Sequence, residues 1–273
     1  MKRIIGLIAL PLISMFSYSQ EIQQKNVPAV ALNAFQLKFP NATDIKWRLE
    51  KGNYRIDFES NNKDNDLIMS DKGELLMHKQ DLYVSEIPKI VLETIQSKVA
   101  FFDVSDADRL EEGGKIRYKI DLKVNDKNNE FIVDETGRLL IYTKELRDSE
   151  VPAQITSLIK TKYGILDLDD ALFTEESGKI TYQLNGEIND KDHVFTFDDR
   201  AIVIKHEQDL LSSEVPVKVM NGVKAAYAGF EVRDAYLMEN GGSVSYRLEM
   251  GKSKERISVV LNPEGTILKV KSK

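Results

Sequence analysis

Ser149-Glu150-Val151-Pro152 begins a stretch of sequence whose pattern returns along the chain. Nearly the same four residues occur as Ser85-Glu86-Ile87-Pro88 and as Ser213-Glu214-Val215-Pro216, and Lys25-Asn26-Val27-Pro28 is a weaker version. Each proline precedes a helical pattern, a turn with glycine and a strand that contains a tyrosine. The four tyrosines, which are separated by equal intervals of sequence, are Tyr54, Tyr118, Tyr182 and Tyr246. Such a constant register predicts four tandem copies of one structural unit.

Positions 1–20 are typical of a signal peptide. Lys2 and Arg3 form a basic start, an apolar run follows, and small residues lie near Ser19-Gln20, where we expect cleavage. The apolar run is shorter than the roughly 20 residues of a membrane-spanning helix, although an uncleaved anchor is the alternative. We therefore predict a periplasmic or secreted protein with no integral membrane segment after cleavage. The predicted division is a signal peptide at 1–20 and units at 21–84, 85–148, 149–212 and 213–273.

Composition excludes several classes of function. The 273 residues include no cysteine, which rules out disulfides, thiol catalysis and metal sites with cysteine ligands. Without Lys2 and Arg3 the chain has 36 basic and 44 acidic residues, a net charge of −8. A negative surface repels nucleic acid and anionic lipid, so neither is expected as a partner.

Each unit reads as one helix followed by four antiparallel strands. Apolar residues recur three, seven and eleven positions after each proline, which predicts a helix with a single apolar stripe. Alternating apolar and polar residues then predict a hairpin, a polar connection and a second hairpin. The predicted polar connections are 61–66, 125–129, 189–192 and 252–255. The fold class is α+β, with the helix covering one face of the sheet and the other face left polar.

Two details of this pattern concern individual side chains. Gly73, Gly137 and Gly265 each lie at the same distance after the tyrosine of their unit, where a tight turn requires positive φ, but the third unit has Ala201. That turn must therefore be built differently or be strained. The four tyrosines and Trp47 alternate in phase with core residues, so we expect them to pack in the core; binding to a partner is the alternative reading.

The first unit resembles a known family. The resemblance rests on Val27-Pro28, Phe39-Pro40-Asn41-Ala42, Ile45, Trp47, Tyr54 and Gly73, in that order and spacing. These residues are similar to the PepSY-like domain of Bacteroidetes secreted proteins, which is related in fold to the beta-lactamase inhibitory protein. The other three units show it more weakly, without the Phe-Pro-Asn-Ala and the tryptophan.

The resemblance implies an α+β repeat in which two units join their sheets into one wider, curved sheet with helices on the convex side. PepSY-type domains are associated with peptidase inhibition or regulation, and the inhibitory protein binds its enzyme on the concave sheet. The resemblance thus implies a protein partner, with a peptidase as one candidate.

Polar side chains on the second strand of each unit form the candidate partner-binding surface. Because they alternate with core residues, they are expected on the uncovered face of the sheet. The predicted binding residues are Arg55, Asp57, Lys119, Asp121, Gln183, Arg247 and Glu249. The alternative is a solvated face on which these charges pair with one another across strands.

Other kinds of site find less support in the sequence. The Asn- and Asp-rich connections could bind Ca²⁺ but do not match the spacing of a calcium-binding loop, and turn chemistry also explains them. His78, His193 and His206 have no second ligand at the spacing of a zinc site. No catalytic or nucleotide-binding motif occurs, so neither an enzyme nor a cofactor is expected.

The leading hypothesis is therefore an exported, non-catalytic protein-binding protein. The alternatives are a small-ligand or Ca²⁺ binder and a structural component of the cell envelope.

Overall fold

The computed structural model describes residues 20–272, and the predicted signal peptide lies outside them except for Gln20. Within these residues the chain forms two compact units: unit 1 comprises 20–122 and Phe131–Leu139, and unit 2 comprises Lys123–Glu130 and 140–272. Their boundary falls inside the second of the four predicted copies. The division of the chain into four domains therefore stays a prediction, and we refer below to four segments of sequence.

Each segment begins with a helix of ten residues: α1 (Ala29–Lys38), α2 (Lys89–Lys98), α3 (Ala153–Lys162) and α4 (Val217–Ala226). The residue before each helix is the repeated proline, whose fixed φ suits a helix start and whose missing N–H costs nothing there. Positions three and seven after the proline are buried, which confirms most of the predicted stripe. These residues are Ala31 and Phe35, Val91 and Ile95, Ile155 and Ile159, and Val219 and Val223.

The glutamate of the repeated phrase caps the turn that precedes the helix. Short 3₁₀ turns, η1 (Gln24–Asn26), η2 (Val84–Glu86) and η3 (Asp148–Glu150), precede the first three helices. The Glu150 carboxylate accepts the Arg147 backbone N–H at 2.9 Å, and Glu86 and Glu214 accept the equivalent N–H groups at 2.8 Å. The repeated glutamate therefore fixes the chain as it enters the helix, in the manner of a capping box.

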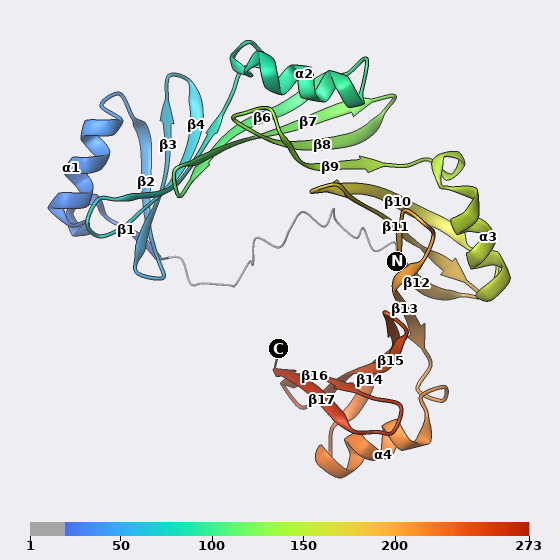
Figure 1. Cartoon of the computed structure of the whole chain (residues 1–273). Coiled ribbons are helices and arrows are strands. Elements are labelled where there is room, and N and C mark those ends of the chain that lie inside the picture. Colours follow the sequence, from blue (N-terminus) through green and yellow to red (C-terminus); the bar gives the residue numbers. More distant parts are fainter. Residues whose placement is uncertain (1–19, 273) are drawn as a thin grey trace. The chain divides into compact units, whose positions relative to one another are not determined.

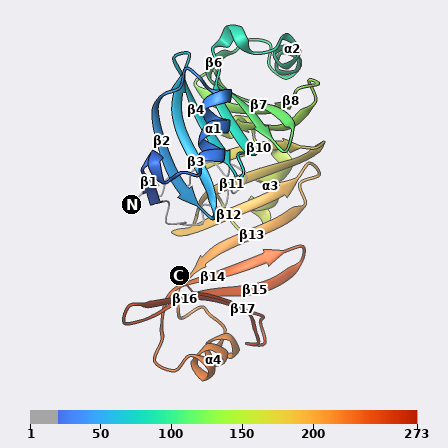
Figure 2. The same cartoon turned by 90° about the vertical axis from the view of Figure 1, so that its left-hand side faces the viewer.

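In unit 1, strands pair in chain order and antiparallel. They are β1 (Gln20–Ile22), β2 (Thr43–Glu50), β3 (Asn53–Ser60), β4 (Lys63–Met69), β5 (Leu75–Asp81) and β6 (Asp103–Glu112). Figure 1 shows α1 beside β2 and Figure 2 shows it in front of β2–β4. β7 (Lys115–Val124) and β8 (Lys127–Asp134) each have residues in both units.

Unit 2 repeats this order along the rest of the chain. After β9 (Leu139–Glu145), the strands are β10 (Asp167–Glu176), β11 (Lys179–Ile188), β12 (Lys191–Asp198), β13 (Val203–Leu210), β14 (Glu231–Asn240), β15 (Ser243–Lys252), β16 (Glu255–Leu261) and β17 (Ile267–Ser272). From β9 to β17 each strand pairs antiparallel with the next. Helices and antiparallel strands together agree with the predicted α+β class.

The sheet does not stop where one segment ends, and this corrects the prediction that segments join in pairs into separate wider sheets. The last strand of each of the first three segments pairs with the first strand of the next, as β5–β6, β9–β10 and β13–β14. β1, which the sequence did not predict, takes the equivalent place beside β2. Because an unpaired strand edge is costly to bury, continuing the ladder across each junction satisfies both edges at once.

The polar connections are also shorter than predicted. The second and third strands of the segments are joined by two residues, Asn61–Asn62, Asn125–Asp126, Asn189–Asp190 and Ser253–Lys254. Both residues of the first three turns have positive φ, the conformation that two-residue hairpins need and that Asn and Asp tolerate. Most residues assigned to the connections therefore belong to strands, which changes the interpretation of the site below.

The helices α1, α3 and α4 pack their apolar stripes on the strands of their own segments. In the first segment, Phe35 contacts Trp47 and Phe58 edge-on, with ring centroids 5.3 and 5.0 Å apart. Trp47 is 2% exposed, and Tyr54 packs against the same cluster, so both are core residues as predicted. Tyr182 and Tyr246 pack likewise in the third and fourth segments.

The turn between the third and fourth strands has the same form in all four segments. Ala201 has φ +60° and its N–H bonds to Asp198 at 3.1 Å, just as Gly265, with φ +84°, bonds to Asn262 at 3.0 Å. The third segment therefore keeps the turn and accepts the strain that a Cβ causes in the left-handed region. At Gly265 a Cβ would overlap the carbonyl oxygen of Lys218 in α4.

This difference predicts opposite effects for two reciprocal substitutions. Ala201→Gly should raise the free energy of unfolding by about 0.5–1 kcal/mol, because it relieves the left-handed strain and loses part of that gain to backbone entropy. Gly265→Ala should lower it by more than about 1 kcal/mol, because it adds strain and a clash with helix backbone. Urea unfolding of each variant, compared with wild type, measures both changes in the free energy of unfolding. A destabilised Ala201→Gly protein would contradict the argument.

Candidate functional site

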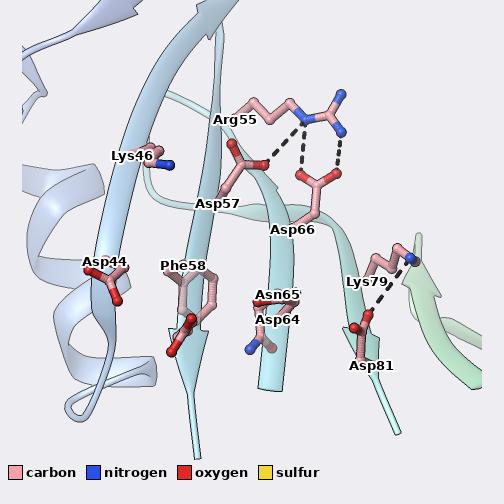
Figure 3. Close-up of a pocket in the computed structure, with 11 residues that line it drawn as sticks. Asp44, Lys46, Arg55, Asp57, Phe58, Asp64, Asn65, Asp66, Lys79 and Asp81 are labelled. Carbon is pink, nitrogen blue, oxygen red and sulfur yellow. Dashed lines mark hydrogen bonds and ion pairs between the residues drawn. The ribbon is translucent and has the colours of Figure 1, made fainter. Parts of the chain in front are cut away.

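The predicted binding residues of unit 1 lie on the face of the sheet that no helix covers; we call this the open face. On β3, Ile56 and Phe58 are buried under α1, so the alternating Arg55 and Asp57 point the other way. Figure 3 shows both side chains on one side of the sheet with those of Asp66 and Lys79. The strand period of two places these charges where the sequence predicted them.

A hollow of about 460 Å³ lies on this face between β2, β3, β4 and β5. The basic residues in its lining are Lys46, Arg55 and Lys79, and the lining contains twice as many acidic residues. The acidic residues in its lining are Asp44, Asp57, Glu59, Asp64, Asp66 and Asp81. The hollow is therefore a negatively charged recess on a face that is otherwise mixed in charge.

Two of the basic side chains are held by the chain itself. The Arg55 guanidinium binds both carboxylate oxygens of Asp66, with the Nε–Oδ1 distance at 3.0 Å, and lies 4.0 Å from Asp57. The Lys79 ammonium lies 3.0 Å from Asp108 of β6 and 3.8 Å from Asp81. Bidentate pairing of this kind fixes an arginine in one geometry, so Arg55 is a positioned part of the wall.

Three of the acidic side chains are not held in this way. Asp44, Glu59 and Asp64 are exposed and make no ion pair with any residue between 20 and 272. Glu59 and Asp64 are direct cross-strand neighbours, an arrangement in which like charges repel. This end of the hollow therefore has negative charge that the chain does not neutralise.

The remaining predicted residues also have polar partners within the chain. Lys119 donates to Asp121 at 2.7 Å on β7 of unit 1. In unit 2, Gln183 lies 3.5 Å from Asn185, and the Arg247 guanidinium binds both oxygens of Glu207 at 2.6 and 3.0 Å and lies 3.5 Å from Glu249. The Arg247–Glu207 pair joins two strands, as the alternative reading expected, whereas Lys119–Asp121 and Gln183–Asn185 each lie within one strand. Binding of a partner by these residues stays a prediction.

Sequence reasoning placed Asp57 on the open face but missed Asp44, Asp64 and Asp66. Asp64 and Asp66 were assigned to a connecting loop, whereas β4 begins at Lys63 and its alternation turns both toward the open face. Asp44 lies in a β-bulge of β2 with φ +52°. Treating Asn61–Asn62 as a two-residue turn would have started the strand early enough to find Asp64 and Asp66.

The same strand register reveals buried polar pairs between the third and fourth strands, which the sequence did not predict. In the first two segments, His78 Nε2 is 2.9 Å from Asn65 Oδ1, and the Tyr142 hydroxyl donates to Asn129 at 3.0 Å. In the third segment His193 Nδ1 is 3.0 Å from His206 Nε2. The three pairs satisfy one another's polar atoms in the core, where unpaired groups are costly. The fourth segment has Ile257 and Val270 instead.

Burial controls the ionisation of these groups. It lowers the pKa of His78 from 6.5 to about 4, helped by the positive charges of Arg109 and Lys38. It also raises the pKa of Asp108 to about 6, against the opposing effect of Lys79. Among residues 20–272 no group of three or more His, Asp or Glu side chains is arranged to hold a metal ion, and no helix there is long and apolar enough to cross a membrane.

The lowered pKa of His78 predicts acid sensitivity in the core of the first segment. The unfolded chain binds the proton more readily than the folded one, so this contribution to stability is lost as the pH falls from 6.5 toward 4. His78→Tyr recreates the Asn129–Tyr142 pair and cannot take that proton. It should reduce the loss of unfolding free energy between about pH 7 and pH 5 by about 2 kcal/mol.

Trp47 is the single tryptophan and packs in this core, so its fluorescence reports urea unfolding of the relevant region. His193→Asn provides a control, because it changes a histidine outside the core that contains Trp47. An unchanged pH dependence in the His78→Tyr protein would show that His78 is not the titrating group.

Comparisons with known proteins give a partial likeness. No family model matches the chain, and no curated protein matches it. Three of the solved structures that resemble part of it come from Bacteroides. A protein from B. eggerthii, provisionally described as periplasmic, has 18% identity and a TM-score of 0.38, over 43% of this chain and 88% of that chain. A DUF2874 family protein from B. uniformis has 21% identity and a TM-score of 0.36, over 44% and 88%.

A BLIP-like protein from B. fragilis also has 21% identity and a TM-score of 0.36, over 42% of this chain and 84% of that chain. All three TM-scores lie below 0.5, and these likenesses therefore establish neither a family nor a shared activity.

Proposed function

We propose that the chain is an exported, non-catalytic protein that binds another protein on the open face of its sheet, at the hollow between β2 and β5. The observation that carries this proposal is the group of unneutralised carboxylates Asp44, Glu59 and Asp64 at one end of that hollow. Peptidase inhibition or regulation is one form that such binding could take. The basic start and the apolar run within positions 1–20 support export.

The chemistry of the hollow favours a partner with basic side chains. Direct opposition of Glu59 and Asp64 costs free energy in the free protein, and a lysine or arginine placed between them would relieve that repulsion. Arg55 and Asp66 form a fixed wall beside them, so little side-chain freedom is lost there on binding. The absence of catalytic motifs from the sequence supports binding without chemistry.

A test should change the free carboxylates and leave the internal ion pairs intact. The triple variant Asp44→Asn, Glu59→Gln, Asp64→Asn removes three negative charges from the hollow with nearly the same side-chain shapes. Immobilised wild-type protein should retain an envelope protein that the triple variant does not, and added salt should release it, because exposed charges are screened.

The matched control removes the same charge elsewhere in unit 1. Asp71→Asn, Glu74→Gln, Glu135→Gln changes exposed residues in turns away from the hollow lining. This control should retain the same protein as wild type. The proposal fails if wild type and the triple variant retain the same set of proteins, or if the control loses binding equally.

A further inference from the structure

The buried pair His193–His206 in unit 2 forms the inner end of a continuous series of polar contacts. His193 is 4% exposed and His206 is fully buried. His206 Nδ1 lies 3.4 Å from a carboxylate oxygen of Glu239, and the same oxygen accepts the Tyr163 hydroxyl at 2.9 Å. Lys162 donates to the Tyr163 hydroxyl at 2.6 Å and is more than half exposed. These polar contacts thus connect two buried imidazoles to the surface.

Residues from three elements form this series of polar contacts. His206 belongs to β13, Glu239 is its direct cross-strand neighbour on β14, and Tyr163 follows the last residue of α3. The His206 ring stacks on Phe195 of β12 at 4.3 Å and contacts the Tyr163 ring at 4.6 Å. The pair therefore lies under the end of α3, at the ladder that joins the third segment to the fourth.

The hydrogen bonds determine how many protons the pair can take. With Glu239 ionised, His206 donates through Nδ1, so its Nε2 accepts the Nδ1–H of His193. One added proton leaves a single N–H between the two rings, because the other imidazole can still accept. Two added protons place an N–H on each of the facing nitrogens, 3.0 Å apart, and make both rings cations in a buried site.

Charged groups around the pair act in both directions. Glu239, Glu207 and Asp192 favour protonation, whereas Lys162 and Lys191 oppose it. Burial is the largest influence on both rings and lowers the pKa of His193 to about 4 and that of His206 in the same direction. Both rings are therefore neutral near pH 7, and acid charges them only against the cost of burial.

We propose that the His193–His206 pair is an acid-sensitive latch, which holds β14 against β13 and the end of α3 when neutral and opens that junction when both rings are protonated. The other segments support this assignment, since at the equivalent positions Asn65–His78 can take one proton and Asn129–Tyr142 none. A pair of histidines occurs only at this junction among the segments that residues 20–272 describe.

The chain supplies its own non-titrating replacement. The double variant His193→Asn, His206→Tyr places the Asn129–Tyr142 pair at the third position. Hydrogen exchange of the full chain, followed by mass spectrometry and corrected for intrinsic rates, should show protection of β13 and β14 falling at least about tenfold between about pH 7 and pH 4.5 in wild type. The double variant should keep its protection, and β15–β16 should change little in either protein.

Equal loss of protection in both proteins, or no loss in wild type, would overturn the proposal. If the double variant does not fold at neutral pH, the wild-type protein supplies a second test through NMR titration of its imidazoles. Protonation of His193 and His206 should then coincide with loss of protection of the β13–β14 ladder. Titration of both rings near 6.5, the ordinary value, with the ladder still protected, would exclude the latch.

Discussion

Antiparallel pairing between the last strand of one segment and the first strand of the next is the interaction on which the rest of the structure depends. A helix on four strands leaves two open edges, and an unpaired edge exposes a row of backbone donors and acceptors. The β5–β6, β9–β10 and β13–β14 ladders satisfy those groups at every junction, and β1 does so beside β2. The helices contribute cores inside the segments, but these ladders make the segments continuous.

The junctions also explain where the buried polar residues occur. The fourth strand carries His78, Tyr142 or His206 toward the core, and each lies opposite a glutamate of the next segment's first strand. Val270 takes that place on β17, which pairs with β16. In each of these three segments the glutamate of the following strand can help to satisfy the buried polar side chain, in agreement with the general cost of burying unpaired polar groups.

Sequence reasoning predicted the features that depend on local pattern. The prolines, the helical stripe and the strand alternation each act within a few residues, so the helices, Trp47 and the open-face position of Arg55 followed from them. The Asn-rich stretches were misread because composition indicates a turn without giving its length, and this displaced the start of β4. The His193–His206 contact and the pairing of strands across junctions depend on register between strands, which one sequence without a structure does not supply.

The open face differs among the segments in the way its charges are balanced. Arg247 on β15 is bound by Glu207 on β13, across β14, and Lys119 is bound by Asp121, so binding a partner there would first have to break an existing pair. A surface ion pair contributes little to stability, but its members are already solvated and oriented. Replacing the internal partner by a charged group of a binding protein therefore gains little free energy. Around Asp44, Glu59 and Asp64 no such exchange is needed, because these carboxylates make no ion pair with any residue between 20 and 272. The gain available to an incoming cation is therefore larger at the first segment, and this makes the hollow, and not the repeated charges as a whole, the better candidate for recognition.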